Sequence, residues 1–194
     1  MAPGTIVSVT PALAIAAHDR YEAIAGHVEQ VGRHAAAIAL RLGLGRRRAS
    51  LLRAAATLHD FGKVAIPDTI LLKPGPLTPA ERRIMERHTE IGHELLAGTG
   101  NGMLDVAARI ALGHHERWDG GGYPLGLARE EIPLDARIVA VADVFDSLTR
   151  ARSYRAGLDR ATALGVVRFG RGTQFDPDVV DAFLASPDRT EVTA

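Results

Sequence analysis

The chain has 194 residues, of which 46% are hydrophobic, and its 23 basic and 23 acidic side chains give a formal net charge of zero. This length suits one domain with a single hydrophobic core that needs no cross-links. The sequence contains no cysteine, which excludes disulfide bonds and thiolate ligands, so a bound metal must be held by nitrogen and oxygen atoms. A neutral chain offers no broad cationic face, and we therefore expect no nucleic-acid partner.

The N-terminal segment, residues 1–17, carries no charge and is fairly apolar. It lacks the basic leading region of a signal peptide, and Pro11 interrupts it well short of the length of a membrane span. We therefore expect a cytoplasmic protein with no membrane segment. One folded domain is predicted over residues 20–186, between an N-terminal tail of residues 1–19 and a C-terminal tail of residues 187–194.

Apolar residues recur at helical spacing along most of the chain, which predicts an all-α bundle of about seven helices. The first predicted helix carries Ile24 and Val31 on one face and ends near Gly43. A second, alanine-rich helix is predicted over residues 50–60. The proline-rich segment that follows, residues 64–78, is predicted to be a long loop.

The second half of the chain is also predicted to be helical. Thr78-Pro79-Ala80-Glu81 matches a capping box with proline at the first helical position, so a third helix is predicted from there to Gly98. The segment from Asp119 to Pro124 contains too many glycines for a regular element and is predicted to be a loop. The remaining helices are predicted over residues 103–116, 133–148, 159–169 and 177–184.

Asp143 is a charged residue in the most apolar predicted helix, where it follows Val141-Ala142 and precedes Val144-Phe145. An isolated carboxylate in such surroundings costs on the order of several kcal/mol or becomes protonated. It therefore needs a partner, which could be an arginine in an ion pair or a bound cation.

His59 and Asp60 are predicted to end the apolar second helix. Phe61-Gly62-Lys63 follows, in which Gly62 stops the helix and Lys63 is one of the two lysines of the chain. Neighbouring residues of a helix point about 100° apart, so the His-Asp pair can address two sides of one site. The two oxygens of an aspartate can also bridge two cations.

Three further histidines are predicted to face the interior. His88 shares a stripe with Ile91, His114 shares a stripe with Ile110, and His115 follows directly. Each of them alone is consistent with a hydrogen-bonded core histidine. Adjacent imidazoles are difficult to bury, however, unless a metal takes up their lone pairs. The histidines and aspartates together predict a two-metal centre.

Two stretches of the sequence resemble the signatures of the HD-GYP phosphodiesterases. They are His59-Asp60-Phe61-Gly62-Lys63 and His114-His115-Glu116-Arg117-Trp118-Asp119-Gly120-Gly121-Gly122-Tyr123-Pro124. Other segments match the same family in order and spacing: Ile66-Pro67-Asp68, Lys73-Pro74-Gly75, Ala136-Arg137-Ile138 and Gln174-Phe175-Asp176-Pro177. The resemblance covers roughly residues 20–185.

This resemblance implies an HD-type bundle that hydrolyses the bacterial second messenger cyclic di-GMP to linear pGpG, GMP or both, through a hydroxide that bridges two divalent metals. Iron or manganese is implied, with zinc as a further option. Asp60 is implied to bridge the metals, and Lys63 to contact the scissile phosphate. Arg152 and Arg155 are implied to hold phosphate oxygens, and Tyr123 to border the substrate cleft. The implied metal ligands are His27, His59, Asp60, His88, His114, His115 and Asp143.

The chain departs from the family pattern at a few positions. Ala23 stands where some members have a glutamate that binds a third metal, which favours two metals here. Ser153 replaces a usual proline, and the glycine that is usual near Arg129 is missing. Neither change removes an implied ligand.

Three alternatives to this function remain open. A related HD-type hydrolase could act on another nucleotide, because the metal ligands specify phosphoryl chemistry better than they specify the base. The chain could instead bind cyclic di-GMP, or a regulatory or diguanylate cyclase domain, with little turnover. It could also be a purely structural helical domain.

Overall fold

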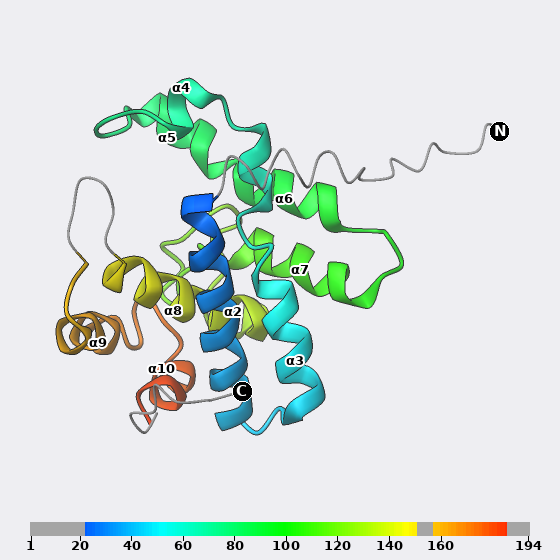
Figure 1. Ribbon diagram of the computed structural model, residues 1–194, viewed down its shortest axis with the longest axis vertical. Helices are drawn as coiled ribbons and strands as arrows, with labels where there is room; N and C mark the ends of the chain where they lie inside the picture. The colour runs from blue at the N-terminus through cyan, green and yellow to red at the C-terminus, as the bar shows by residue number, and fades with distance from the viewer. Residues whose placement is uncertain (1–21, 151–156, 186–194) are drawn as a thin grey trace.

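The computed structural model in Figure 1 describes residues 22–150 and 157–185. These ranges contain α-helices and short 3₁₀ helices but no strand, which confirms the predicted all-α class. The helices are α2 (Glu22–Arg41), α3 (Gly45–Ala56), α4 (Asp68–Leu71), α5 (Pro79–Glu86), α6 (His88–Leu96), α7 (Gly102–Gly113), α8 (Leu134–Thr149), α9 (Arg160–Phe169) and α10 (Pro177–Leu184). The 3₁₀ helices are η1 (Phe61–Ala65) and η2 (Arg129–Glu131).

Helices α2 and α8 form the centre of the bundle (Figure 1). Helix α2 packs against α3 and α8, and α8 also contacts α7, α9 and α10. Helix α6 packs on α7 and on η1, whereas α4 and α5 lie at one end of the molecule. The core between these helices is apolar and close-packed, with Val31, Ile38, Leu52, Ile110, Val139 and Val167 each 0% exposed.

Helix α5 begins as the sequence predicts. The Thr78 hydroxyl accepts a hydrogen bond from the Glu81 N–H at 3.3 Å, and the Glu81 carboxylate accepts one from the Thr78 N–H at 2.8 Å. This reciprocal capping box satisfies two N–H groups that the first helical turn leaves without a partner.

Some predicted boundaries are wrong, and the described ranges hold nine α-helices where about seven were expected. Helix α3 begins before residue 50, at Gly45. It ends before residue 60 because the chain tightens into i→i+3 turns after Ala56. The helix predicted from Pro79 to Gly98 is divided at Arg87 into α5 and α6. Near this break the Thr89 hydroxyl donates to the Glu86 carbonyl, which takes the place of helical bonding.

Two further corrections concern loops. The segment predicted as a loop over residues 64–78 contains the short helix α4. The helix predicted over residues 103–116 ends at Gly113, so that His114 and His115 follow its last turn. Within the described ranges, no helix is both long enough and apolar enough to cross a bilayer. The domain limits remain a prediction, since both predicted tails lie outside the described residues.

Gly62 allows an unusually close approach of η1 to α6. A Cβ atom at this position would overlap the carbonyl oxygen of His88 and the backbone nitrogen of Gly92. The contact brings the turn that carries Asp60 against the helix that begins with His88.

We therefore expect Gly62→Ala to lower the free energy of unfolding by about 1–3 kcal/mol, because the backbone of α6 must shift to admit the methyl group. Gly165→Ala, in the middle of α9, is the matched control. Nothing lies within 4 Å of a Cβ at Gly165, so this substitution should instead raise the free energy of unfolding by about 0.5–1 kcal/mol. Urea unfolding measures the free energy of unfolding of both variants, and equal effects would contradict the close approach of η1 to α6.

Candidate metal centre

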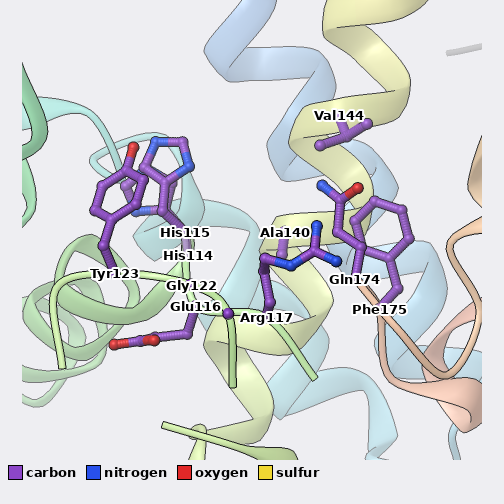
Figure 2. A pocket seen from close by; sticks show the side chains of 11 residues that line it. His114, His115, Glu116, Arg117, Gly122, Tyr123, Ala140, Val144, Gln174 and Phe175 are labelled. Carbon is purple, nitrogen blue, oxygen red and sulfur yellow. The ribbon is translucent and has the colours of Figure 1, made fainter. Parts of the chain in front are cut away.

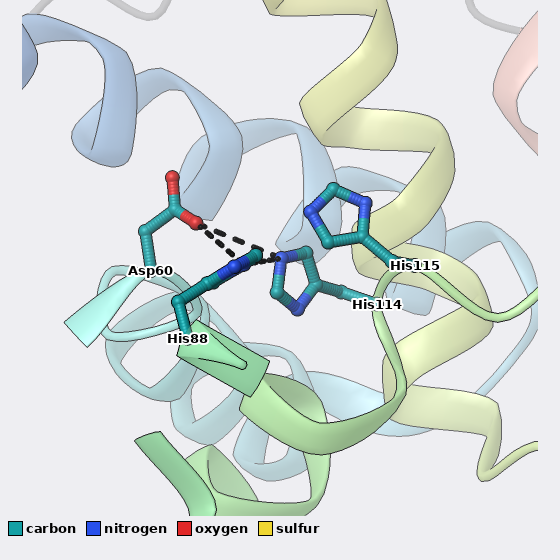
Figure 3. A group of neighbouring side chains, drawn as sticks. All are labelled: Asp60, His88, His114 and His115. Atoms are coloured by element: carbon teal, nitrogen blue, oxygen red, sulfur yellow. Dashed lines mark hydrogen bonds and ion pairs between the residues drawn. The ribbon is translucent and has the colours of Figure 1, made fainter. Parts of the chain in front are cut away.

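The structure brings the predicted histidines and aspartates together from five parts of the chain. His27 lies on α2, His59 and Asp60 follow α3, and Asp143 lies on α8. His88 begins α6, while His114 and His115 follow α7. Two groups of potential ligand atoms result, and within each group the atoms lie within 4.8 Å of one another. The first consists of Asp60, His88, His114 and His115 (Figure 3), and the second of His27, His59 and Asp60.

Asp60 belongs to both groups and turns one oxygen to each. Its Oδ1 lies 3.3 Å from His88 Nε2 and 3.7 Å from His114 Nε2. Its Oδ2 lies 3.4 Å from His59 Nε2 on the other side. A carboxylate placed in this way can bridge two cations.

Backbone carbonyls in preceding helical turns orient three of the histidine rings. The Nδ1–H of His59 donates to the Ala56 carbonyl at 2.8 Å, and the Nδ1–H of His88 donates to the Met85 carbonyl at 2.7 Å. His114 uses its Nδ1–H in the same way toward Ala111. The three carbonyls lie in the last turns of α3, α5 and α7, where those of Ala56 and Met85 also accept a backbone N–H, so the ring bonds add to the hydrogen bonds of the helix ends. Each ring then directs its Nε2 toward Asp60.

His27 is oriented by a carboxylate that sequence reasoning missed. Its Nδ1–H donates to Oδ2 of Asp146 at 2.6 Å, and Asp146 also accepts a hydrogen bond from Arg150. A carboxylate behind a histidine is a common arrangement at metal sites, where it sets the tautomer and raises the basicity of the ligand. A signal for Asp146 was present in the sequence, since it lies one helical turn after Asp143.

Buried polar atoms at the centre test whether a metal fits. Within the described part of the chain, His59 Nε2 and Asp60 Oδ1 are buried and have no hydrogen-bond partner. Such atoms cost roughly 1–3 kcal/mol each when left unsatisfied. A cation beside His59 would satisfy its Nε2, and a cation between Asp60 Oδ1 and the imidazoles of His88 and His114 would satisfy that oxygen. Imidazole with carboxylate oxygen is a donor set suited to divalent transition metals. The residues present therefore fit a metal.

Among the described residues, Asp143 contacts histidines and not an arginine. Its Oδ1 lies 3.2 Å from His27 Nε2 and 3.8 Å from His59 Nε2, and it also accepts from the Ser147 hydroxyl. Burial opposes its ionisation, but the hydrogen bond from His27 and the charge of His59 hold the pKa of Asp143 well below its usual range. Asp143 lies outside both groups of mutually close atoms, yet it faces the His27 side of the centre.

The two sides of the centre differ electrostatically. Burial opposes protonation of His27, but its hydrogen bonds to Asp143 and Asp146 raise its pKa to about 9. Burial and the neighbouring His114 lower the pKa of His115 to about 2. At neutral pH a metal would therefore displace a proton from His27, whereas His115 already carries a free lone pair.

Lys63 lies in η1, next to the proposed bridging residue. Its ammonium contacts Oδ2 of Asp60 at 2.5 Å, and its side chain is 25% exposed. Burial raises the pKa of Asp60, but the charges of His59 and Lys63 outweigh that effect and keep it well below its usual value. Lys63 is thus close enough to the centre to act on an anion there, and it also restrains Asp60.

Tyr123 lies beside a cavity of about 220 Å³ that adjoins the histidines (Figure 2). The tyrosine ring stacks on His115 with a centroid separation of 4.8 Å, and Gln174 and Arg117 also line the cavity. Arg152 and Arg155 lie outside the described residues. The side chain of Ala23, on which the expectation of two metals depends, also lies outside the described residues.

Comparison with known proteins agrees with this geometry. The HD domain family matches residues 11–179 of the chain. The cyclic di-GMP phosphodiesterase response regulator RpfG of Xanthomonas campestris pv. campestris is 52% identical over 157 residues, which are 81% of this chain and 42% of that protein. The 3'3'-cGAMP-specific phosphodiesterase 2 of Vibrio cholerae is 40% identical over 172 residues, which are 89% of this chain and 33% of that protein. The chain thus spans less than half the length of these curated relatives.

A solved structure shares the fold. It is that of an HDG"Y"P protein from Bdellovibrio bacteriovorus, with a TM-score of 0.63 and 21% sequence identity, and the match covers 81% of this chain and 50% of that one. At this identity the likeness concerns the fold alone. The family match over most of the sequence and the shared helical fold lead to one conclusion, which is that the chain belongs to the HD domain family.

Proposed function

We propose that this chain is a metal-dependent phosphodiesterase that hydrolyses cyclic di-GMP to linear pGpG, GMP or both. The observation that carries the proposal is Asp60, which turns one oxygen to each of two ligand groups and whose buried Oδ1 has no hydrogen-bond partner among the described residues. The 52% identity to RpfG, which is named a cyclic di-GMP phosphodiesterase, supports the substrate. Since the chain spans less than half of that protein, the activity is a proposal for this chain.

The proposed centre holds two divalent metals with Asp60 between them. Membership of the HD domain family supports divalent metal binding, and the nitrogen and oxygen donors favour iron or manganese, with zinc as a further option. When bound, such cations activate water and offset the charge on a phosphoryl group. The proposed ligands are His27, His59, Asp60 and Asp143 on one side and Asp60, His88, His114 and His115 on the other.

The other predicted residues would bind and orient the substrate. Lys63 is proposed to neutralise charge that develops on the scissile phosphate, since its ammonium lies beside Asp60. Tyr123 is proposed to border the substrate cleft, which the cavity beside His115 supports. Arg152 and Arg155 are proposed to hold phosphate oxygens, on the family resemblance of the sequence alone. Since cyclic di-GMP is a bacterial second messenger, the proposal also includes a cytoplasmic location, and a regulatory or diguanylate cyclase partner remains a prediction.

A second candidate substrate is 3'3'-cGAMP. The Vibrio cholerae relative that is named as specific for it is 40% identical across 89% of this chain. The ligand groups address the phosphodiester and not the bases, so they suit either molecule. Chromatography of the products from the two cyclic dinucleotides, measured with the same metal-loaded chain, distinguishes them. If 3'3'-cGAMP were hydrolysed faster, it would replace cyclic di-GMP as the proposed substrate. If neither molecule were hydrolysed, the proposed function would be contradicted.

Asp60→Ala should abolish hydrolysis and reduce the metal content from two ions per chain to less than one, because both ligand groups lose a shared oxygen. Helical content should stay near that of the wild type, since the apolar core lies elsewhere. Metal analysis and circular dichroism measure these effects. Asp181→Ala is the control, because Asp181 is an exposed aspartate that pairs with Arg171. If Asp60→Ala kept two metals and full activity, the assignment of Asp60 would be wrong.

Lys63→Ala should leave the metal content near that of the wild type but lower turnover about 10²–10³-fold, as expected for a group that stabilises charge in the transition state. Lys63→Arg should restore only part of the activity, because a planar guanidinium does not replace a compact ammonium. Lys73→Ala is a matched control, since Lys73 also pairs with a carboxylate, that of Glu81 at 2.6 Å.

The contact between Lys63 and Asp60 also defines the result that would contradict a catalytic role of Lys63. If Lys63→Ala lost metal and activity to the same extent, the lysine would act by holding Asp60 in place, and its proposed catalytic role would be withdrawn.

A further inference from the structure

Glu116 is a buried carboxylate that the proposed mechanism does not use. It is 4% exposed, and it forms no ion pair with any described residue. Figure 2 shows its carboxylate pointing away from the rings of His114 and His115, and it belongs to neither group of potential metal ligands. A buried carboxylate must be stabilised by hydrogen bonds. The role of Glu116 therefore follows from the groups that donate those bonds.

The hydrogen bonds of Glu116 hold the loop that follows it. Oε1 accepts from the N–H of Leu125 at 2.7 Å, and Oε2 accepts from the N–H of Leu127 at 3.1 Å. Bonds from backbone N–H groups to an ionised carboxylate are among the stronger hydrogen bonds in proteins. Gly122 lies against the backbone of Glu116 so closely that a Cβ there would overlap it. The loop is therefore folded back onto the residue that precedes it.

The folded loop carries Tyr123 to His115. The N–H of Tyr123 donates to the His115 carbonyl at 3.3 Å, and its ring lies over the imidazole at a centroid distance of 4.8 Å and an angle of 24° (Figure 2). The orientation of the His115 ring depends on this stacking contact, whereas hydrogen bonds orient the other histidine rings of the centre. Its ring makes no hydrogen bond to a described residue, whereas those of His27, His59, His88 and His114 each donate one from Nδ1.

We propose that Glu116 is a positioning residue that acts through Tyr123. Its carboxylate holds the loop of residues 120–127 so that the tyrosine ring keeps the imidazole of His115 turned toward Asp60, His88 and His114. The inference rests on the proposed function, in which His115 binds a metal. For the other histidines a carbonyl or carboxylate behind the ring sets its orientation, and for His115 the stacked ring replaces that hydrogen bond.

The test is a titration of the metal-stripped 194-residue chain with Mn²⁺ by calorimetry. Glu116→Gln keeps the shape of the side chain, but an amide has one acceptor oxygen where the carboxylate has two, so one loop N–H loses its partner. We expect Mn²⁺ affinity at one of two sites to fall about 10–100-fold, the usual effect of losing the support behind a ligand. Glu131→Gln is the matched control, because the exposed Glu131 accepts from the Ala128 N–H just after the loop. It should bind Mn²⁺ as the wild type does.

A double-mutant cycle with Tyr123→Ala separates positioning from a general loss of structure. If Glu116 acts through Tyr123, the variant with both substitutions binds Mn²⁺ no more weakly than Tyr123→Ala alone, because contacting residues on one pathway are not additive. Full additivity of the two losses would overturn the inference, as would wild-type affinity in Glu116→Gln. Should Glu116→Gln fail to fold, Tyr123→Ala decides: at least a tenfold loss in the folded variant supports the stacking role, and wild-type affinity overturns it.

The wild-type titration keeps this inference distinct from the proposed function. A wild-type chain that took up no metal would overturn the proposed function and the role of Glu116 with it. Two metals in the wild-type chain, together with unchanged affinity in Glu116→Gln, would overturn the role of Glu116 alone.

Discussion

The Asp60 carboxylate lies inside a helical bundle with its two oxygens directed at different sets of imidazole nitrogens. A buried charge of this kind constrains its surroundings, because every neighbouring group must either stabilise it or be excluded. Lys63 contacts one oxygen, while the other has no hydrogen-bond partner among the described residues. The arrangement fits a bound cation, which would satisfy this oxygen.

Helix ends and ring orientation depend on the same hydrogen bonds at this centre. His59, His88 and His114 each donate their Nδ1–H to a carbonyl in the last turn of the preceding helix. One bond therefore ties a ring to a helix end and also fixes the tautomer of a ring whose other nitrogen faces Asp60. Because α3 and α7 are held by the apolar core, the rings of His59 and His114 are held as well, which is what a preorganised site requires.

The two sides of the proposed metal centre differ in the protonation of their histidines. On one side, Asp143 and Asp146 raise the pKa of His27 to about 9, so that metal binding at neutral pH would release a proton. On the other, burial lowers the pKa of His115 to about 2, and the ring is ready to donate its lone pair. This second side also carries the ring that is oriented by stacking on Tyr123, so its geometry depends on the glycine-rich loop.

Much of this protein is determined by its sequence, because periodicity, helix caps and side-chain chemistry are local properties. The all-α class, the capping box at Thr78 and the histidines and aspartates that meet at the centre are all evident from it. The tertiary structure alone decided how they meet: His27 contacts Asp146 across 119 residues of chain, and Asp143 contacts His27 and His59 where an arginine was an equal possibility. It also decided that α3 ends at Ala56 and that Arg87 divides the third predicted helix. The physical reason is that a helix end, or the partner of a buried carboxylate, depends on groups that only packing brings within hydrogen-bonding distance.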